Sequence, residues 1–193
     1  MAILIVCPGM HDPQWTAPLS EQLRTGALWP GAKHYIFPHH PHWAWSPHAL
    51  RTWLGTTVAL GSPLVFLGFS AGCVAAIATA WACQYQRDYP VEAVIALDGW
   101  GVPLVGPFAT YRLSHDRYTH VTGAWLGPGD QSFYAEPAVP HQQLWQAPQR
   151  VWGWGTANPT AAISGLGQGV GVPHRYMTAL QFLGQCLSDY GET

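Results

Sequence analysis

A serine stands at the centre of a short turn flanked by glycines. The residues Gly68-Phe69-Ser70-Ala71-Gly72 follow an apolar run, 63–69, and precede a run of small residues, 73–83. The apolar run predicts a buried strand, and the small residues predict a helix that can lie close to it. Glycines two positions either side of a serine permit a tight strand-to-helix turn that holds the hydroxyl clear of the chain. The pattern predicts a nucleophile at Ser70.

A serine that attacks a carbonyl group needs hydrogen-bond donors for the oxyanion that forms. The helix that begins after Ser70 offers free N–H groups, and the N–H of Ala71 is the first candidate. A second donor is expected from the loop after an earlier strand. Residues 2–7 predict such a strand, and the loop CPGMHDP that follows makes the N–H of Met10 our second candidate. The alternative is a plain tight turn in an α/β domain.

Serine also needs a histidine as its base. His141 follows residues 132–139, interpreted as a last, edge strand, and precedes a helical turn. His174 follows a glycine-rich stretch, 151–172, interpreted as a long loop, and precedes an expected terminal helix. We favour His141 because a recognisable strand leads into it, and His174 stays open as its rival.

The histidine in turn needs a carboxylate that fixes its tautomer. Three aspartates compete for this role: Asp98, Asp116 and Asp130. Asp98 directly follows residues 91–97, the clearest strand after the serine, which places its carboxylate at the same sheet edge as Ser70. We favour Asp98 for that reason.

The other two aspartates have alternative interpretations. Asp130 would pair with His174 if residues 120–130 formed a further strand and its loop. Asp116 could cap a helix or form an ion pair with Arg112. The choice among the three carboxylates therefore remains open from the sequence.

The apolar pattern of the whole chain alternates between strands and helices. Strands are predicted at 2–7, 34–38, 63–69, 91–97 and 132–139, and helices at 15–28, 47–60, 73–83 and 175–190. Ser46 is expected to cap the second of these helices. Residues 111–125 fit a helix or a helix-to-strand passage. This alternation predicts a single α/β domain, 1–193, built as a three-layer sandwich around a mainly parallel sheet.

The composition excludes several classes of protein. Hydrophobic residues make up 48% of the chain and charged residues 9%, with a net charge of −2. A disordered chain needs the opposite balance, and nothing here attracts nucleic acid. Eleven tryptophans predict aromatic surface that could line an apolar substrate cleft or contact a second copy or another protein. The alternative is a tryptophan-rich core.

The remaining motifs predict no metal and no cofactor. Four histidines lie between residues 39 and 48, but prolines keep this piece irregular and no carboxylate or cysteine completes a ligand set. The four cysteines fit no metal or redox spacing and are expected to be buried. Residues 1–9 read as a strand and not as a signal peptide, and no apolar run reaches the length of a membrane span. We expect a cytoplasmic protein.

The turn at Ser70, the early loop CPGMHDPQW and the order Ser, Asp, His resemble the α/β-hydrolase superfamily, in particular its small members without a lid. The resemblance covers most of residues 1–100 and fades afterwards. It implies a minimal α/β-hydrolase fold and a serine hydrolase for esters or thioesters, and the tryptophan-rich loops favour an apolar acyl or aromatic group. The alternative is a non-catalytic binding or scaffold protein on the same fold.

Overall fold

A computed structural model describes residues 1–31, 33–38, 42–157 and 174–191. An eight-stranded sheet runs through it in the order β2-β1-β3-β4-β5-β6-β7-β8. The strands are β1 Ile3–Cys7, β2 His34–Ile36, β3 Leu64–Phe69, β4 Val91–Leu97, β5 Ala109–Ser114, β6 Gln131–Ala135, β7 Trp152–Ala157 and β8 His174–Thr178. Strands β1 to β6 pair in parallel, and β7 and β8 join them antiparallel. The mainly parallel α/β sheet predicted from the sequence is confirmed.

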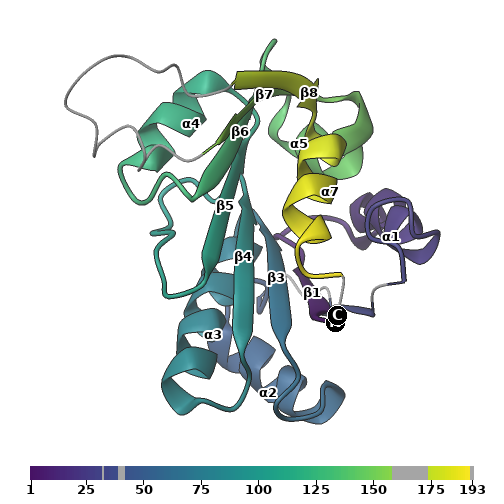
Figure 1. Ribbon diagram of the computed structural model, residues 1–193, viewed down its shortest axis with the longest axis vertical. Helices are drawn as coiled ribbons and strands as arrows, with labels where there is room; N and C mark the ends of the chain where they lie inside the picture. The colour runs from purple at the N-terminus through teal and green to yellow at the C-terminus, as the bar shows by residue number, and fades with distance from the viewer. Residues whose placement is uncertain (32, 39–41, 158–173, 192–193) are drawn as a thin grey trace.

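Helices cover both faces of this sheet, which makes three layers (Figure 1). The α-helices are α1 Ala17–Arg24, α2 Pro47–Thr57, α3 Gly72–Gln86, α4 Arg117–Ala124, α5 His141–Gln146 and α7 Ala179–Ser188, with 3-10 turns η1 Pro13–Thr16 and η2 Pro148–Arg150. One apolar core holds buried side chains of α1, α5 and α7, and a second holds those of α2 and α3. Among the described residues, no helix is long and apolar enough to cross a membrane.

Strand β3 shows how the sequence builds two cores at once. All six of its residues are buried. Val65, Leu67 and Phe69 contribute to one core, and Leu64 and Phe66 to the other, because successive side chains of a strand point to opposite faces. A strand buried on both faces must be apolar throughout, which is why this stretch is readable from the sequence.

The register of the parallel strands brings their carboxyl ends to one edge. Gly68 pairs with Cys7, Phe69 with Leu97, and Leu97 with Leu113. The loops that follow β1, β3, β4 and β5 therefore open side by side. This edge is where an open α/β sheet binds its ligands.

Two expectations for the second half of the chain were wrong. Strand β6 is not an edge strand, because β5 flanks it on one side and β7 on the other. Part of the stretch expected to be a loop, 151–172, is strand β7, and residues 158–173 lie outside the described residues. Glycines have little preference for strands, so the pattern WGWGTA gave no strand signal.

The terminal helix is shorter than predicted. It begins at Ala179, because residues 174–178 extend as strand β8 along β7. Thr178 caps it: its hydroxyl accepts from the N–H of Gln181, whose side chain accepts from the N–H of Thr178. This reciprocal cap is a sequence signal that marks the true start of the helix.

The segment expected to be a helix or a helix-to-strand passage, 111–125, has the reverse order: most of strand β5 comes first and α4 follows it. The further strand considered at 120–130 is therefore wrong, since that segment holds the end of α4 and a loop. The first predicted helix, 15–28, is a 3-10 turn followed by α1, with Pro18 in its first turn. Ser46 accepts a hydrogen bond from Ala49 at the start of α2, which confirms it as the predicted cap.

Candidate functional site

Ser70 occupies the turn between β3 and α3 with a left-handed backbone, φ 51°. Its N–H donates to Leu97 of the neighbouring strand at 2.9 Å, and its carbonyl accepts from the N–H of Cys73 at 3.1 Å. A non-glycine residue in this region is strained by about 1–2 kcal/mol. The hydrogen bonds hold the strained turn in place.

The two glycines beside Ser70 allow close packing of the turn. A Cβ atom at Gly68 would lie 2.8 Å from the Cα of Cys73 in α3. At Gly72 a Cβ atom would lie 2.0 Å from the carbonyl oxygen of Cys7, the last residue of β1. No side chain fits at such distances, so α3 can approach β1 and β3 only because both positions are glycine.

The loop after β1 lies directly against Ser70. A Cβ atom at Gly9 would be 2.9 Å from the carbonyl oxygen of Phe69 and 3.1 Å from the Cβ of Ser70. Met10, the candidate oxyanion donor, follows Gly9, and its side chain is exposed. The structure thus brings the loop that carries Met10 to the turn that carries Ser70 and Ala71.

Asp98 follows β4, and its side chain is only 1% exposed. Its Oδ2 lies 2.8 Å from Nδ1 of His141, while its Oδ1 accepts the backbone N–H of His115 at 2.8 Å. Its own N–H donates to Leu113 at 2.8 Å. Asp98 also has a left-handed backbone, φ 50°, which aspartate tolerates better than most residues.

His141 is the first residue of α5, and its side chain is 36% exposed. Its ring stacks on Phe69 with centroids 4.7 Å apart, and Phe69 stacks in turn on Trp145 at 5.0 Å. Because Nδ1 faces the carboxylate of Asp98, Nε2 is the nitrogen left for a substrate or a nucleophile. The sheet and α5 together fix the orientation of the ring.

Electrostatics keep the Asp98 carboxylate ionised despite its burial. Burial by itself raises the pKa of Asp98, but hydrogen bonds from His115 and His141 outweigh it and bring the pKa below the ordinary value. Asp98 has the converse effect on its neighbour, because the hydrogen bond to the carboxylate raises the pKa of His115. The site therefore stabilises a negative charge at Asp98 over the physiological range.

A pocket of about 440 Å³ collects these groups at the carboxyl edge of the sheet. It is lined by Ser70, Asp98, Trp100, His115, Tyr118, Thr119 and His141. The predicted nucleophile, acid and base thus line one cavity. Three loops and two helices far apart in the sequence contribute to it.

Neither rival aspartate contacts His141 in the way Asp98 does: Asp116 lies beside His115 at the rim of the site, and Asp130 lies away from it. Asp116 is the N-cap of α4 and accepts the N–H of Thr119 at 2.6 Å, which agrees with the capping alternative. Asp130 accepts the N–H of Thr110 at 2.8 Å, near the start of β5 and thus at the opposite end of the strand from the pocket. The backbone of His174 begins β8, but its side chain lies outside the described part of the structure.

Arg112 does not pair with Asp116. Its guanidinium donates instead to backbone carbonyls of three loop residues, Gly99, Val102 and Gly127. Burial lowers the pKa of Arg112, since no carboxylate faces it in these contacts.

Sequence reasoning missed His115 as a residue of the site. Its ring Nδ1 lies 3.1 Å from Oδ1 of Asp98, and its Nε2 lies 3.3 Å from Oδ2 of Asp116. Had residues 109–114 been interpreted as a strand, the histidine that follows would have been placed at the same edge as Ser70 and Asp98. Because β5 contains polar residues, its sequence lacks the continuous apolar pattern that predicts a buried strand.

Asp98, His115 and His141 are also the residues that could hold a metal ion among those described. Each offers one ligand atom, and these atoms lie within 4.8 Å of one another. Oδ2 of Asp98 is hydrogen-bonded to Nδ1 of His141 at 2.8 Å, and its Oδ1 lies 3.1 Å from Nδ1 of His115, so the three groups already face one another. Of the histidines considered between 39 and 48, His39 and His40 lie outside the described residues.

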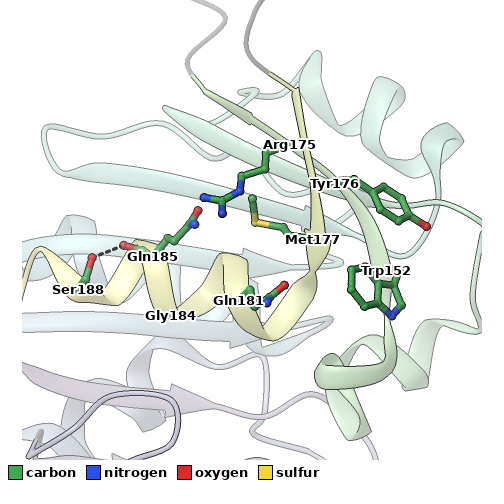
Figure 2. Close-up of a pocket in the computed structure, with 8 residues that line it drawn as sticks. All are labelled: Trp152, Arg175, Tyr176, Met177, Gln181, Gly184, Gln185 and Ser188. Atoms are coloured by element: carbon green, nitrogen blue, oxygen red, sulfur yellow. Dashed lines mark hydrogen bonds between the residues drawn. The ribbon is translucent and has the colours of Figure 1, made fainter.

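A larger cavity, of about 570 Å³, lies between α7 and the paired strands β7 and β8 (Figure 2). Its lining consists of Trp152, Arg175, Tyr176, Met177, Gln181, Gly184, Gln185 and Ser188. None of them is a candidate nucleophile, base or acid. Size alone does not identify the functional site, and the smaller pocket at Ser70 holds Asp98 and His115, whose pKa values are shifted.

Comparison with known proteins adds little at the level of sequence. No family model matches the chain, and no curated protein matches it. Among solved structures, the chain is similar to the type II thioesterase YbtT from a yersiniabactin NRPS/PKS biosynthetic pathway, with 17% identity and a TM-score of 0.38. The similarity covers 54% of this chain and 44% of that one, so the chain spans less than half of the thioesterase's length.

Proposed function

We propose that this protein is a serine hydrolase that cleaves esters or thioesters of apolar acyl or aromatic groups. The observation that carries the proposal is the buried carboxylate of Asp98, 2.8 Å from Nδ1 of His141, in the pocket that Ser70 also lines. A carboxylate, an imidazole and a hydroxyl in this order are what a weak nucleophile needs for activation. The left-handed turn at Ser70 supports the same role.

The reaction would begin when Oγ of Ser70 attacks the carbonyl carbon while Nε2 of His141 takes its proton. Asp98 holds the Nδ1–H of the ring and stabilises the imidazolium that forms. The N–H groups of Met10 and Ala71 would donate to the oxyanion. His141 then protonates the departing alcohol or thiol, and water, activated by the same ring, releases the acyl group and restores Ser70.

The walls of the pocket support an apolar or aromatic substrate. Trp100 and Tyr118 line it and remain 61% and 71% exposed, so both rings are accessible at its mouth. Burial of an apolar group against such rings contributes about 25 cal/mol per Å² of surface removed from water. A substrate with an aromatic or acyl group would therefore bind better than a small polar ester.

The direct test compares wild type with Ser70→Ala in the hydrolysis of p-nitrophenyl acetate and butyrate. We expect the variant to lose about a thousandfold or more in kcat/KM, because the remaining groups cannot form the acyl-enzyme. A fluorophosphonate probe should label wild type at Ser70. Ser62→Ala, at the opposite end of β3, is the matched control and should keep its activity.

Equal rates for wild type and Ser70→Ala, together with an unlabelled Ser70, would overturn the proposal. The fold would then serve the non-catalytic binding role considered above.

The base is tested separately by His141→Gln and His174→Gln. We expect His141→Gln to lose about a thousandfold in kcat, because the proton of Ser70 then has no acceptor. His174→Gln should retain the wild-type rate. The reverse pattern would assign the base to His174.

A further inference from the structure

His115 contacts the oxygen of Asp98 that the proposed triad leaves unused. Its backbone N–H donates to Oδ1 at 2.8 Å, and its ring Nδ1 lies 3.1 Å from the same atom. Oδ2 is thereby left to face His141 at 2.8 Å. Two histidines, one in the loop after β5 and one at the start of α5, thus share one buried carboxylate, each on its own oxygen.

We propose that His115 is a positioning residue, which rests on the proposed function of the site. It holds the Asp98 carboxylate in the rotation that directs Oδ2 at His141, and its charge tunes how readily the His141 ring takes a proton. No atom of His115 needs to touch the substrate for this role. It acts through its contact with Asp98 and through the electrostatic interaction between its ring and the ring of His141.

A second contact fixes the other side of the His115 ring. Nε2 lies 3.3 Å from Oδ2 of Asp116, whose Oδ1 accepts the N–H of Thr119 and caps α4. The line of contacts runs from the start of α4 through Asp116, His115 and Asp98 to His141. The ring of His115 therefore cannot turn without breaking contacts at both of its nitrogens.

The charges around His115 favour its cationic form. Asp98, which follows β4, and Asp116, on its own segment, both face the ring, and its side chain is 24% exposed. His141 of α5 meets it edge to face, with ring centroids 5.8 Å apart. Tyr118 of α4 lines the same pocket, and Arg117 at the start of that helix is exposed.

A cation at His115 has two effects on His141. It partly offsets the negative charge of Asp98, and it opposes a second positive charge at a ring 5.8 Å away. Both effects favour the neutral form of His141, which is the form that can accept the proton of Ser70. Removal of the cation should therefore leave His141 a weaker acceptor of that proton toward acidic pH.

The experiment compares wild type with His115→Gln, which removes the charge but keeps a side chain able to donate a hydrogen bond. We expect the acidic limb of the kcat/KM profile to move up by about 0.5 to 1 pH unit. We expect kcat to fall by about tenfold while KM changes by less than about twofold, because the proposed role of His115 acts on proton transfer and glutamine keeps a polar side chain in the pocket wall. His120→Gln is the matched control, since the ring of His120 lies against Tyr134 and not against Asp98.

A second variant covers the case in which His115→Gln does not fold. Asp116→Asn keeps a good capping residue for α4 but removes one of the two carboxylates that face His115. With less negative charge beside it, His115 loses its proton at lower pH. The acidic limb of the kcat/KM profile should then move in the same direction as in His115→Gln, but by less.

A readout that does not need turnover separates this inference from the proposed function. The ring nitrogens of His141 are followed by NMR against pH in wild type and His115→Gln. An upward shift of its titration without any esterase activity would support the coupling and refute the hydrolase. Active wild type with superimposable titrations and pH profiles in both proteins would refute the role of His115 alone.

Discussion

Ser70 and Asp98 are the first residues after two neighbouring strands, and both have left-handed backbones, φ 51° and φ 50°. The residues before them, Phe69 and Leu97, are paired across β3 and β4. The two strained residues are therefore neighbours in space and share the same backbone conformation. Strained backbone concentrates at functional sites, where the surrounding structure supports it. Here the support comes from hydrogen bonds to Leu97 and Leu113.

At the residue scale we predict that the pair His115–Asp98 makes stability depend on pH. The pKa of His115 is raised above its ordinary 6.5, so its contribution is complete below that pH and is lost as pH rises through the raised value. The pKa of Asp98 is lowered from 3.8, so its contribution is lost only as pH falls through the lowered value. The free energy of unfolding of wild type should therefore exceed that of His115→Gln most clearly between pH 3.8 and pH 6.5, the two ordinary pKa values.

Urea unfolding of wild type and His115→Gln from pH 4 to pH 9 measures how the difference in their free energies of unfolding depends on pH. We expect wild type to be more stable by about 1 kcal/mol near pH 5, with the difference shrinking above neutral pH. A difference that stays constant over the whole range would show that the contribution of His115 is packing and not charge.

At the element scale the site depends on how closely α3 approaches β1. Gly72→Ala would place a methyl group 2.0 Å from the carbonyl oxygen of Cys7. We expect a loss of about 3 kcal/mol or more in the free energy of unfolding, because backbone must move to admit the methyl group. Thermal unfolding followed by circular dichroism, with Ser70 labelling, measures both the stability and the site.

Gly55→Ala is the matched control for that substitution. Gly55 lies inside α2, and no atom of the described residues lies within 4 Å of a Cβ atom placed there. Alanine should stabilise this helix by about 0.5–1 kcal/mol, since glycine is a poor helix former. If both substitutions had the same effect, close approach would not be the reason for glycine at position 72.

Strands that carry polar or glycine residues were the elements that sequence reasoning missed. β5 contains Arg112, which is 2% exposed and reads as a surface residue in the sequence. In β7, a Cβ atom at Gly153 would lie 2.0 Å from the carbonyl oxygen of Tyr134, so glycine there is required by the neighbouring strand β6. Both strands exist because of partners distant in the chain. Local preference could not reveal them.

At the scale of the whole molecule Arg112 links the loop after β4, which carries Trp100 of the pocket, to the loop between α4 and β6. Its guanidinium donates to Gly127 at 2.9 Å and to Gly99 and Val102 at 3.2 Å each. Arg112→Met would leave buried carbonyl groups without these donors, so we expect a loss of about 2–4 kcal/mol in the free energy of unfolding. Arg117→Met, an exposed position on α4, should change stability by less than about 0.5 kcal/mol.

Arg112→Met should also loosen the loop that carries Trp100, a residue that follows Gly99 and lines the pocket. Urea unfolding gives the stability, and KM for an aromatic ester reports on the pocket. We expect KM to rise while kcat changes less, because Arg112 does not contact the proposed triad. A wild-type unfolding midpoint in Arg112→Met would contradict the structural role.

The tryptophans are divided between the two places considered from composition, the core and the surface. Trp29 and Trp145 are buried in the core beside α1 and α5. Six others have large exposed fractions: Trp43, Trp45, Trp81, Trp100, Trp125 and Trp152. The four cysteines are free and buried, as predicted. Composition indicates how many rings must find a place, but packing decides which of them face water.

The sequence by itself determined the first half of this molecule. Strands buried on both faces must be apolar throughout, and a serine between two glycines after such a strand can be read directly, so β1, β3, β4 and the turn at Ser70 follow from residue type. Only the tertiary structure decided that Asp98 and not Asp130 is the carboxylate beside His141, and that His115 joins the pair. Those choices depend on the register of distant strands and on carbonyl groups that satisfy Arg112, and neither is encoded in any local pattern.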